Sequence, residues 1–90
     1  MDIYASVKLF LRVNSASAEP EIQQTVDSCL LDLRNAGVSR LDTDDPLIQQ
    51  AAKLYCKAHF GFSADSDRYD RAYEHLKASL SLSGDYNGNT

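Results

Sequence analysis

The chain has 90 residues, which predicts a single domain. Its composition, 43% hydrophobic and 24% charged, is that of a folded globular protein rather than a disordered one. The apolar runs are too short for a transmembrane span, and residues 1–6 lack the features of a secretory signal, so we expect a cytoplasmic protein. The net charge of −4 disfavours adhesion to nucleic-acid phosphates, which requires a basic surface.

The first predicted element is a short helix over residues 2–12, with Asp2 as its N-cap. Its apolar residues follow helical spacing: Ile3, Val7, Phe10 and Leu11. We expect this helix to dock on another element or another molecule. The helical pattern ends after it, at residues 14–17.

The second predicted helix begins near Ser17, a suitable N-cap, and ends before Gly37. Pro20, flanked by two glutamates, falls in the first turn, where its missing N–H costs nothing and acids suit the helix dipole. The apolar stripe consists of Ile22, Val26, Cys29, Leu30 and Leu33. Leu31 lies on the opposite side of the helix.

Residues 38–42 alternate apolar and polar side chains, which indicates either a short strand or an extended link. A strand here would need a partner from this chain or a neighbouring one.

The third predicted helix starts at Asp45–Pro46, an N-cap followed by proline at the first helical position, and Gly61 stops it. Its apolar residues span an arc of about 200°, so the helix should be central and pack against several partners. We expect the hub of the core to consist of Leu47, Ile48, Ala51, Leu54 and Tyr55.

The fourth predicted helix covers residues 66–82 and is capped by Asp65 or Ser66. Its inner stripe consists of Tyr69, Ala72, Tyr73, Leu76 and Leu80. Residues 83–90 are polar and rich in Gly and Asn, so we expect a mobile tail. The pattern therefore predicts an all-α fold, a bundle of about four helices over residues 1–82, followed by a flexible tail at 83–90.

The chain offers little for catalysis or metal binding. His59 and His75 have no partners at catalytic or metal spacing, and Cys29 and Cys56 lie on apolar stripes as expected for buried free thiols. The acidic group around Asp65 lacks the glycine and glutamate of a calcium loop. We predict no enzyme activity, no metal and no cofactor.

A helix-turn-helix that binds DNA is a further alternative for the third and fourth predicted helices. A recognition helix presents polar and basic groups at its N-terminal end. The third helix opens with Asp45 and the fourth with Asp65 and Asp67, so carboxylates would face the phosphates. This disfavours DNA-binding regulation.

Apolar residues off the main stripes indicate protein–protein contact. The candidates for a subunit or partner interface are Leu9, Leu31, Leu82 and Tyr86. A domain this small buries little surface, and association with neighbours is a common remedy.

Residues 45–62, DPLIQQAAKLYCKAHFGF, resemble the core motif of head–tail connector (adaptor) proteins of tailed bacteriophages. Residues 69–83, YDRAYEHLKASLSLS, are similar to the last helix of that family, and residues 7–13, VKLFLRV, to its start. The resemblance covers nearly the whole chain, with most of the specificity in the third and fourth helices.

This resemblance implies a helical subunit without cofactors that assembles into a ring of about a dozen copies beneath the portal protein. The ring would extend the DNA channel without binding DNA specifically and would serve as a platform for a neck or tail completion protein. The protein would reside in the virion, in the host cytoplasm before assembly, and would have no membrane partner. The alternative is a small helical regulatory or protein-interaction module of a phage or mobile element.

Overall fold

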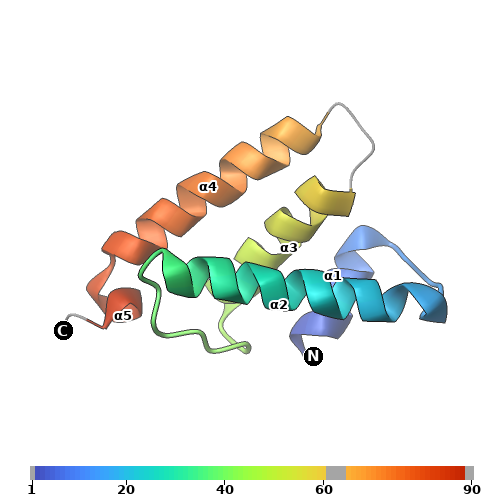
Figure 1. Ribbon diagram of the computed structural model, residues 1–90, viewed down its shortest axis with the longest axis horizontal. Coiled ribbons are helices and arrows are strands. Elements are labelled where there is room, and N and C mark those ends of the chain that lie inside the picture. The colour runs from blue at the N-terminus through green and yellow to red at the C-terminus, as the bar shows by residue number, and fades with distance from the viewer. Residues whose placement is uncertain (1, 61–64, 89–90) are drawn as a thin grey trace.

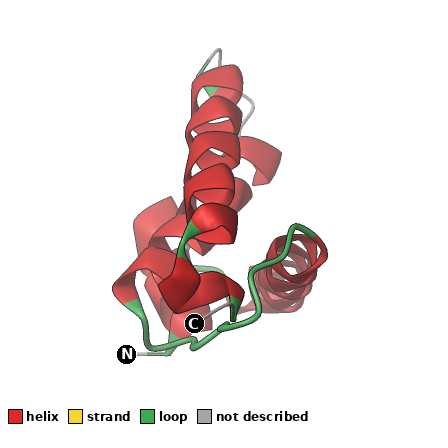
Figure 2. Cartoon of the chain, turned by 90° about the vertical axis from the view of Figure 1, so that its left-hand side faces the viewer, coloured by secondary structure: helices red, strands yellow, loops and turns green. Residues whose placement is uncertain are grey.

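The computed structural model describes residues 2–60 and 65–88, and within these ranges all regular structure is helical (Figure 2). The elements in chain order are α1 (Ile3–Leu11), a 3-10 turn η1 (Ala16–Ala18), α2 (Glu19–Asn35), α3 (Pro46–Phe60), α4 (Ser66–Leu82) and the short α5 (Gly84–Asn87). The predicted all-α class is confirmed. The structure adds a fifth helix, α5, to the four that were expected.

Helix α3 is the central element, because it contacts α1, α2 and α4. The molecule is flat, with extents of 42 × 27 × 18 Å, and α2 runs along its longest axis in front of α3 (Figure 1). In that view the C-terminal end of α4 approaches the end of α2, and the two helices diverge towards the other side. The start of α2 and helix α1 therefore lie at one end of the molecule, and α5 lies at the other.

Two helix starts follow the sequence prediction, and one differs from it. The amide of Ala5 donates to Asp2 Oδ1 at 2.8 Å, and the amide of Leu47 donates to Asp45 Oδ1 at 2.8 Å, so both aspartates act as N-caps. Ser17 does not cap α2, which begins at Glu19. The η1 turn occupies the preceding residues, and Ser15 caps that turn instead by accepting from the Ser17 amide at 3.2 Å.

Two glycines were expected to end helices. Gly37 has a φ of +104°, a conformation that favours glycine, and it directly follows the end of α2. Gly61, the predicted stop of the third helix, lies outside the described residues.

The core is apolar and draws on every long helix. The buried hydrophobic residues are Ile3, Val7, Ile22, Val26, Cys29, Leu33, Val38, Ile48, Ala51, Ala52, Cys56, Tyr73 and Leu80. Both cysteines are free and fully buried, as predicted. Desolvation by burial raises the pKa of each thiol to about 12, which disfavours the reactive thiolate.

The expected hub on α3 divides into three groups. Ile48 and Ala51 are fully buried, whereas Leu54 and Tyr55 are half-buried and pack against the core. Leu47 is 43% exposed, so its assignment to the core was wrong. The buried side of α3 is formed by positions 48, 51, 52 and 56, whereas Leu47 lies in the first turn of the helix, at the margin of this side.

Residues 38–42 form an extended link and not a strand. Val38 anchors the link in the core. The amides of Ser39 and Arg40 donate to the carbonyl oxygen of Tyr86, at 2.8 and 3.0 Å. The link therefore obtains its hydrogen bonds from α5, and it needs no partner strand.

Candidate functional site

The histidines lie at the surface. His59 is exposed, its Nδ1 lies 2.8 Å from the carbonyl oxygen of Tyr55, and its ring stacks on the Tyr55 ring with centroids 4.0 Å apart. His75 is also exposed. Within the described ranges, no cluster of three or more His, Cys, Asp or Glu side chains could hold a metal ion. Each helix there is also too short or too polar to cross a bilayer.

A polar cluster joins α2 to α4. The buried Tyr73 hydroxyl donates to Asp32 Oδ2 at 2.6 Å, and Lys77 Nζ lies 2.9 Å from the same oxygen. Lys77 also pairs with Glu74 at 2.7 Å. The Cys29 thiol donates a weaker bond to the Tyr73 hydroxyl at 3.8 Å. We name Asp32, Tyr73 and Lys77 the α2–α4 clasp.

The electrostatics of the clasp are those of a structural contact. Desolvation alone would raise the pKa of Asp32, but the hydrogen bonds from Tyr73 and Lys77 outweigh it and lower that pKa. Desolvation, together with the hydrogen bond to Asp32, raises the pKa of Tyr73. Asp32 therefore remains charged and Tyr73 remains protonated at neutral pH. This arrangement orients two helices and contains no group poised for proton transfer.

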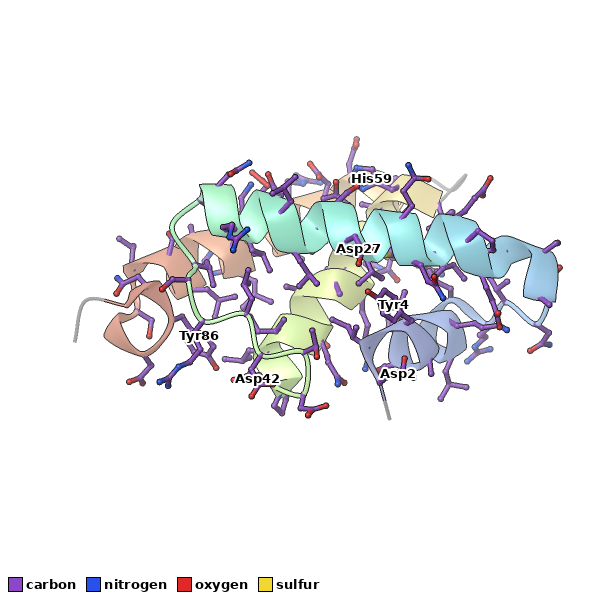
Figure 3. The ribbon with its side chains drawn as sticks, turned by 60° about the horizontal axis from the view of Figure 1, so that its bottom comes forward. Asp2, Tyr4, Asp27, Asp42, His59 and Tyr86 are labelled. Atoms are coloured by element: carbon purple, nitrogen blue, oxygen red, sulfur yellow. The ribbon has the colours of Figure 1, made fainter. Side chains whose placement is uncertain are left out.

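The C-terminal segment is folded against the link. The Tyr86 hydroxyl donates to Asp45 Oδ2 at 2.9 Å, while the Tyr86 carbonyl oxygen accepts from Ser39 and Arg40. Figure 3 shows Tyr86 beside the link that leads to Asp42. Desolvation would raise the pKa of Asp45, but the hydrogen bonds from the Leu47 amide and from Tyr86 lower it. One carboxylate thus caps α3 and also holds α5.

This arrangement corrects the expected tail. We predicted that residues 83–90 are mobile and that Tyr86 is available to a partner, but α5 forms over Gly84–Asn87 and Tyr86 is half-buried within its own chain. The physical reason is the set of hydrogen bonds between Tyr86 and the link. A sequence signal was present, because Gly88 adopts a φ of +80° directly after α5, as glycines that end helices do.

The remaining interface candidates are exposed in the isolated chain. Leu9 is 67% exposed, Leu31 55% and Leu82 83%. Their helices place them apart: Leu9 near the end of α1, Leu31 on the outer side of α2, and Leu82 at the last position of α4. Their role in contacts with other proteins stays a prediction.

A groove lies between α1 and the first half of α2, and Leu9 is one of its lining residues. It has a volume of about 540 Å³ and is lined by Asp2, Tyr4, Ala5, Lys8, Leu9, Val13, Asn14, Glu19, Ile22 and Gln23. Two contacts between the helices hold its walls. The Tyr4 hydroxyl donates to Asp27 Oδ1 at 2.7 Å, and Lys8 Nζ lies 2.6 Å from Glu19 Oε1. No local sequence pattern indicates the groove, because its residues come from two separate helices and the loop between them.

Comparisons with known proteins identify the family. Neither the curated proteins nor the solved structures contain a match to this chain. A family model described as "Phage connector protein" matches residues 3–87, which includes every helix of the structure. The chain therefore belongs to the phage connector family, and it has a structural connector role in the phage particle.

Proposed function

We propose that the protein is the head–tail connector subunit that forms a ring beneath the portal, extends the DNA channel and offers a platform to a neck or tail completion protein. Family membership over residues 3–87 is the observation that carries the proposal. The ring would consist of about a dozen copies in the virion, built from subunits present in the host cytoplasm before assembly.

The surface of the subunit supports this proposal. A ring built from one repeated chain needs two different contact surfaces on each copy. The exposed residues Leu9 and Leu82 occur on different helices, as such contacts require. The net charge of −4 suits a conduit, since a net acidic surface repels phosphate and lets DNA pass without specific binding.

The test is the assembly state of the purified chain, alone and together with the portal protein of the same phage. Light scattering after gel filtration would give the mass, and negative-stain electron microscopy would show the shape. Closed rings, or a ring bound to the portal, are the expected result. A chain that stays monomeric in both conditions and binds no portal would contradict the proposal.

A further inference from the structure

We infer that the groove between α1 and α2 receives the C-terminal end of α4 from the next copy of this chain, with Leu82 as the inserted side chain. This inference rests on the proposed ring and names the contact that builds it. Tyr4, Val13 and Ile22 give part of the groove an apolar lining. At 83%, Leu82 has the largest exposed fraction among the exposed large hydrophobic residues of the described chain.

The positions of the two surfaces fit a head-to-tail contact. The groove lies at the end of the molecule that contains α1 and the start of α2, and Leu82 lies at the opposite end, beside α5 (Figure 1). Figure 3 shows the same separation, with Asp2 and Tyr4 on one side and Tyr86 on the other. A contact between opposite ends is heterologous, and such a contact closes into a ring when the rotation per copy divides a full turn and the copies do not rise along the axis.

The volume of the groove fits a helix end and not just one side chain. At about 540 Å³, it is several times larger than a leucine side chain, and within the range of sites that take whole ligands. The polar turn that follows Leu82 can therefore enter with it. This turn consists of Ser83, which joins α4 to α5, and Gly84, the first residue of α5, and both are half-buried. Because α5 is fixed to the link through Tyr86, the end of α4 is presented without ordering a mobile tail.

The charges beside the two surfaces are complementary. Arg12 directly follows α1 and precedes the lining residue Val13, and Asp85 lies in α5, three residues after Leu82. Both side chains are exposed, and neither takes part in an ion pair within the described part of the chain. The inferred contact places Asp85 of one copy near Arg12 of the next, and the charge-reversal variants described below test this placement. Arg12 and Asp85 can then pair between copies.

Site-directed cross-linking tests the contact. The variants Leu9→Cys and Leu82→Cys are mixed under mild oxidation, in whichever condition the wild type assembles. The native cysteines do not compete, because Cys29 and Cys56 are fully buried. We expect a disulfide between the two variants, and a ladder of linked copies from the chain that carries both substitutions. Leu31→Cys is the matched control, since Leu31 is exposed on the outer side of α2, and we expect no link between it and Leu82→Cys.

Three further variants measure the strength of the contact without disturbing the fold. Leu82→Asp places a charge in the groove and should weaken association more than about tenfold. Arg12→Glu should weaken it about two- to fivefold, as expected for an exposed ion pair, and the added change Asp85→Lys should restore it. All three positions are exposed, so we expect each variant to fold like the wild type. Circular dichroism melts check that it does.

The outcomes separate this contact from the proposed ring. If the wild type assembles but Leu82→Cys links to itself or to Leu31→Cys, or if Leu82→Asp assembles normally, the contact is wrong and the ring remains. If the wild type assembles neither alone nor with the portal, both proposals fail.

Discussion

Helices α2 and α4 have the same length but bury different numbers of apolar side chains. Helix α2 buries four apolar residues in the core, whereas α4 buries only Tyr73 and Leu80. Helix α4 packs mainly against α3, and hydrogen bonds add to this packing: the α2–α4 clasp joins α4 to α2, and Tyr86 holds α5 to the link. A small helical domain can thus combine burial with a few hydrogen bonds that position its C-terminal part.

The two forces differ in size. Truncation of a buried leucine or isoleucine costs about 2–5 kcal/mol, whereas a typical hydrogen bond contributes about 0.5–1.5 kcal/mol net. The α5 end, which has no fully buried residue and is held to the link by the bonds of Tyr86, should therefore be the first part to open locally. Leu82, the residue that we place in the contact between copies, lies beside this end.

The largest effect should come from the apolar core. Ile48→Ala should lower the free energy of unfolding by about 2–5 kcal/mol, because Ile48 is fully buried and its truncation leaves a cavity. Leu47→Ala is the matched control on the same helix and should cost less than about 1 kcal/mol, since Leu47 is 43% exposed. Urea melts measure both values. Equal midpoint shifts in the two variants would contradict the assignment of the buried side of α3.

The α2–α4 clasp should give the next largest effect. Tyr73→Phe keeps the buried ring but removes the hydroxyl that donates to Asp32, and should cost about 1–2 kcal/mol. Tyr4→Phe is the control, because Tyr4 donates to Asp27 with nearly the same geometry, 2.7 against 2.6 Å, in an exposed position. Water can replace that bond, so Tyr4→Phe should cost less than about 0.5 kcal/mol. If Tyr4→Phe costs as much stability as Tyr73→Phe or more, burial does not determine how much each hydrogen bond contributes.

The contact between α5 and the link predicts a local effect. Removal of residues 84–90 should speed amide hydrogen exchange at Ser39 and Arg40, because both amides donate to the Tyr86 carbonyl oxygen. Tyr86→Phe keeps these two bonds and loses only the bond to Asp45, at a cost of about 0.5–1.5 kcal/mol. Exchange measured by NMR separates the two variants. Unchanged protection at Ser39 and Arg40 after the truncation would mean that α5 does not hold the link.

The smallest effect should be the pH dependence of the clasp. The folded state lowers the pKa of Asp32, so its contribution to stability is present above the unfolded-state pKa and is lost as the pH falls through the folded-state value. Wild type should therefore lose stability in this acid range, and the difference between wild type and Asp32→Asn should shrink there. Thermal melts at a series of pH values measure the difference. If the difference in stability between wild type and Asp32→Asn stays constant down to low pH, the charge of Asp32 does not contribute to stability.

The sequence predicted much of the fold because local rules decide it. The N-caps at Asp2 and Asp45, the proline in the first turn of α2 and the apolar spacing along α2 all act within a few residues. The extent of α4, residues 66–82, was also read correctly. The burial of Cys29 and Cys56 followed from their places on apolar stripes. The family resemblance was confirmed over residues 3–87.

Other features depended on residues far apart in the sequence. Tyr86 was expected to be mobile because its neighbours are polar, but the amides of Ser39 and Arg40 and the carboxylate of Asp45 give it partners that no local pattern reveals. The Asp32–Tyr73 bond likewise joins residues 41 positions apart.

The sequence by itself therefore determined the helical class, most helix boundaries and the family, since these depend on spacing along the chain. The tertiary structure alone decided that residues 38–42 remain a link, that Leu47 faces outwards and that α1 and α2 enclose a groove. Each of these features depends on how separate helices are placed relative to one another. Packing sets that placement through the sum of many weak contacts, which the periodicity of a single helix does not encode.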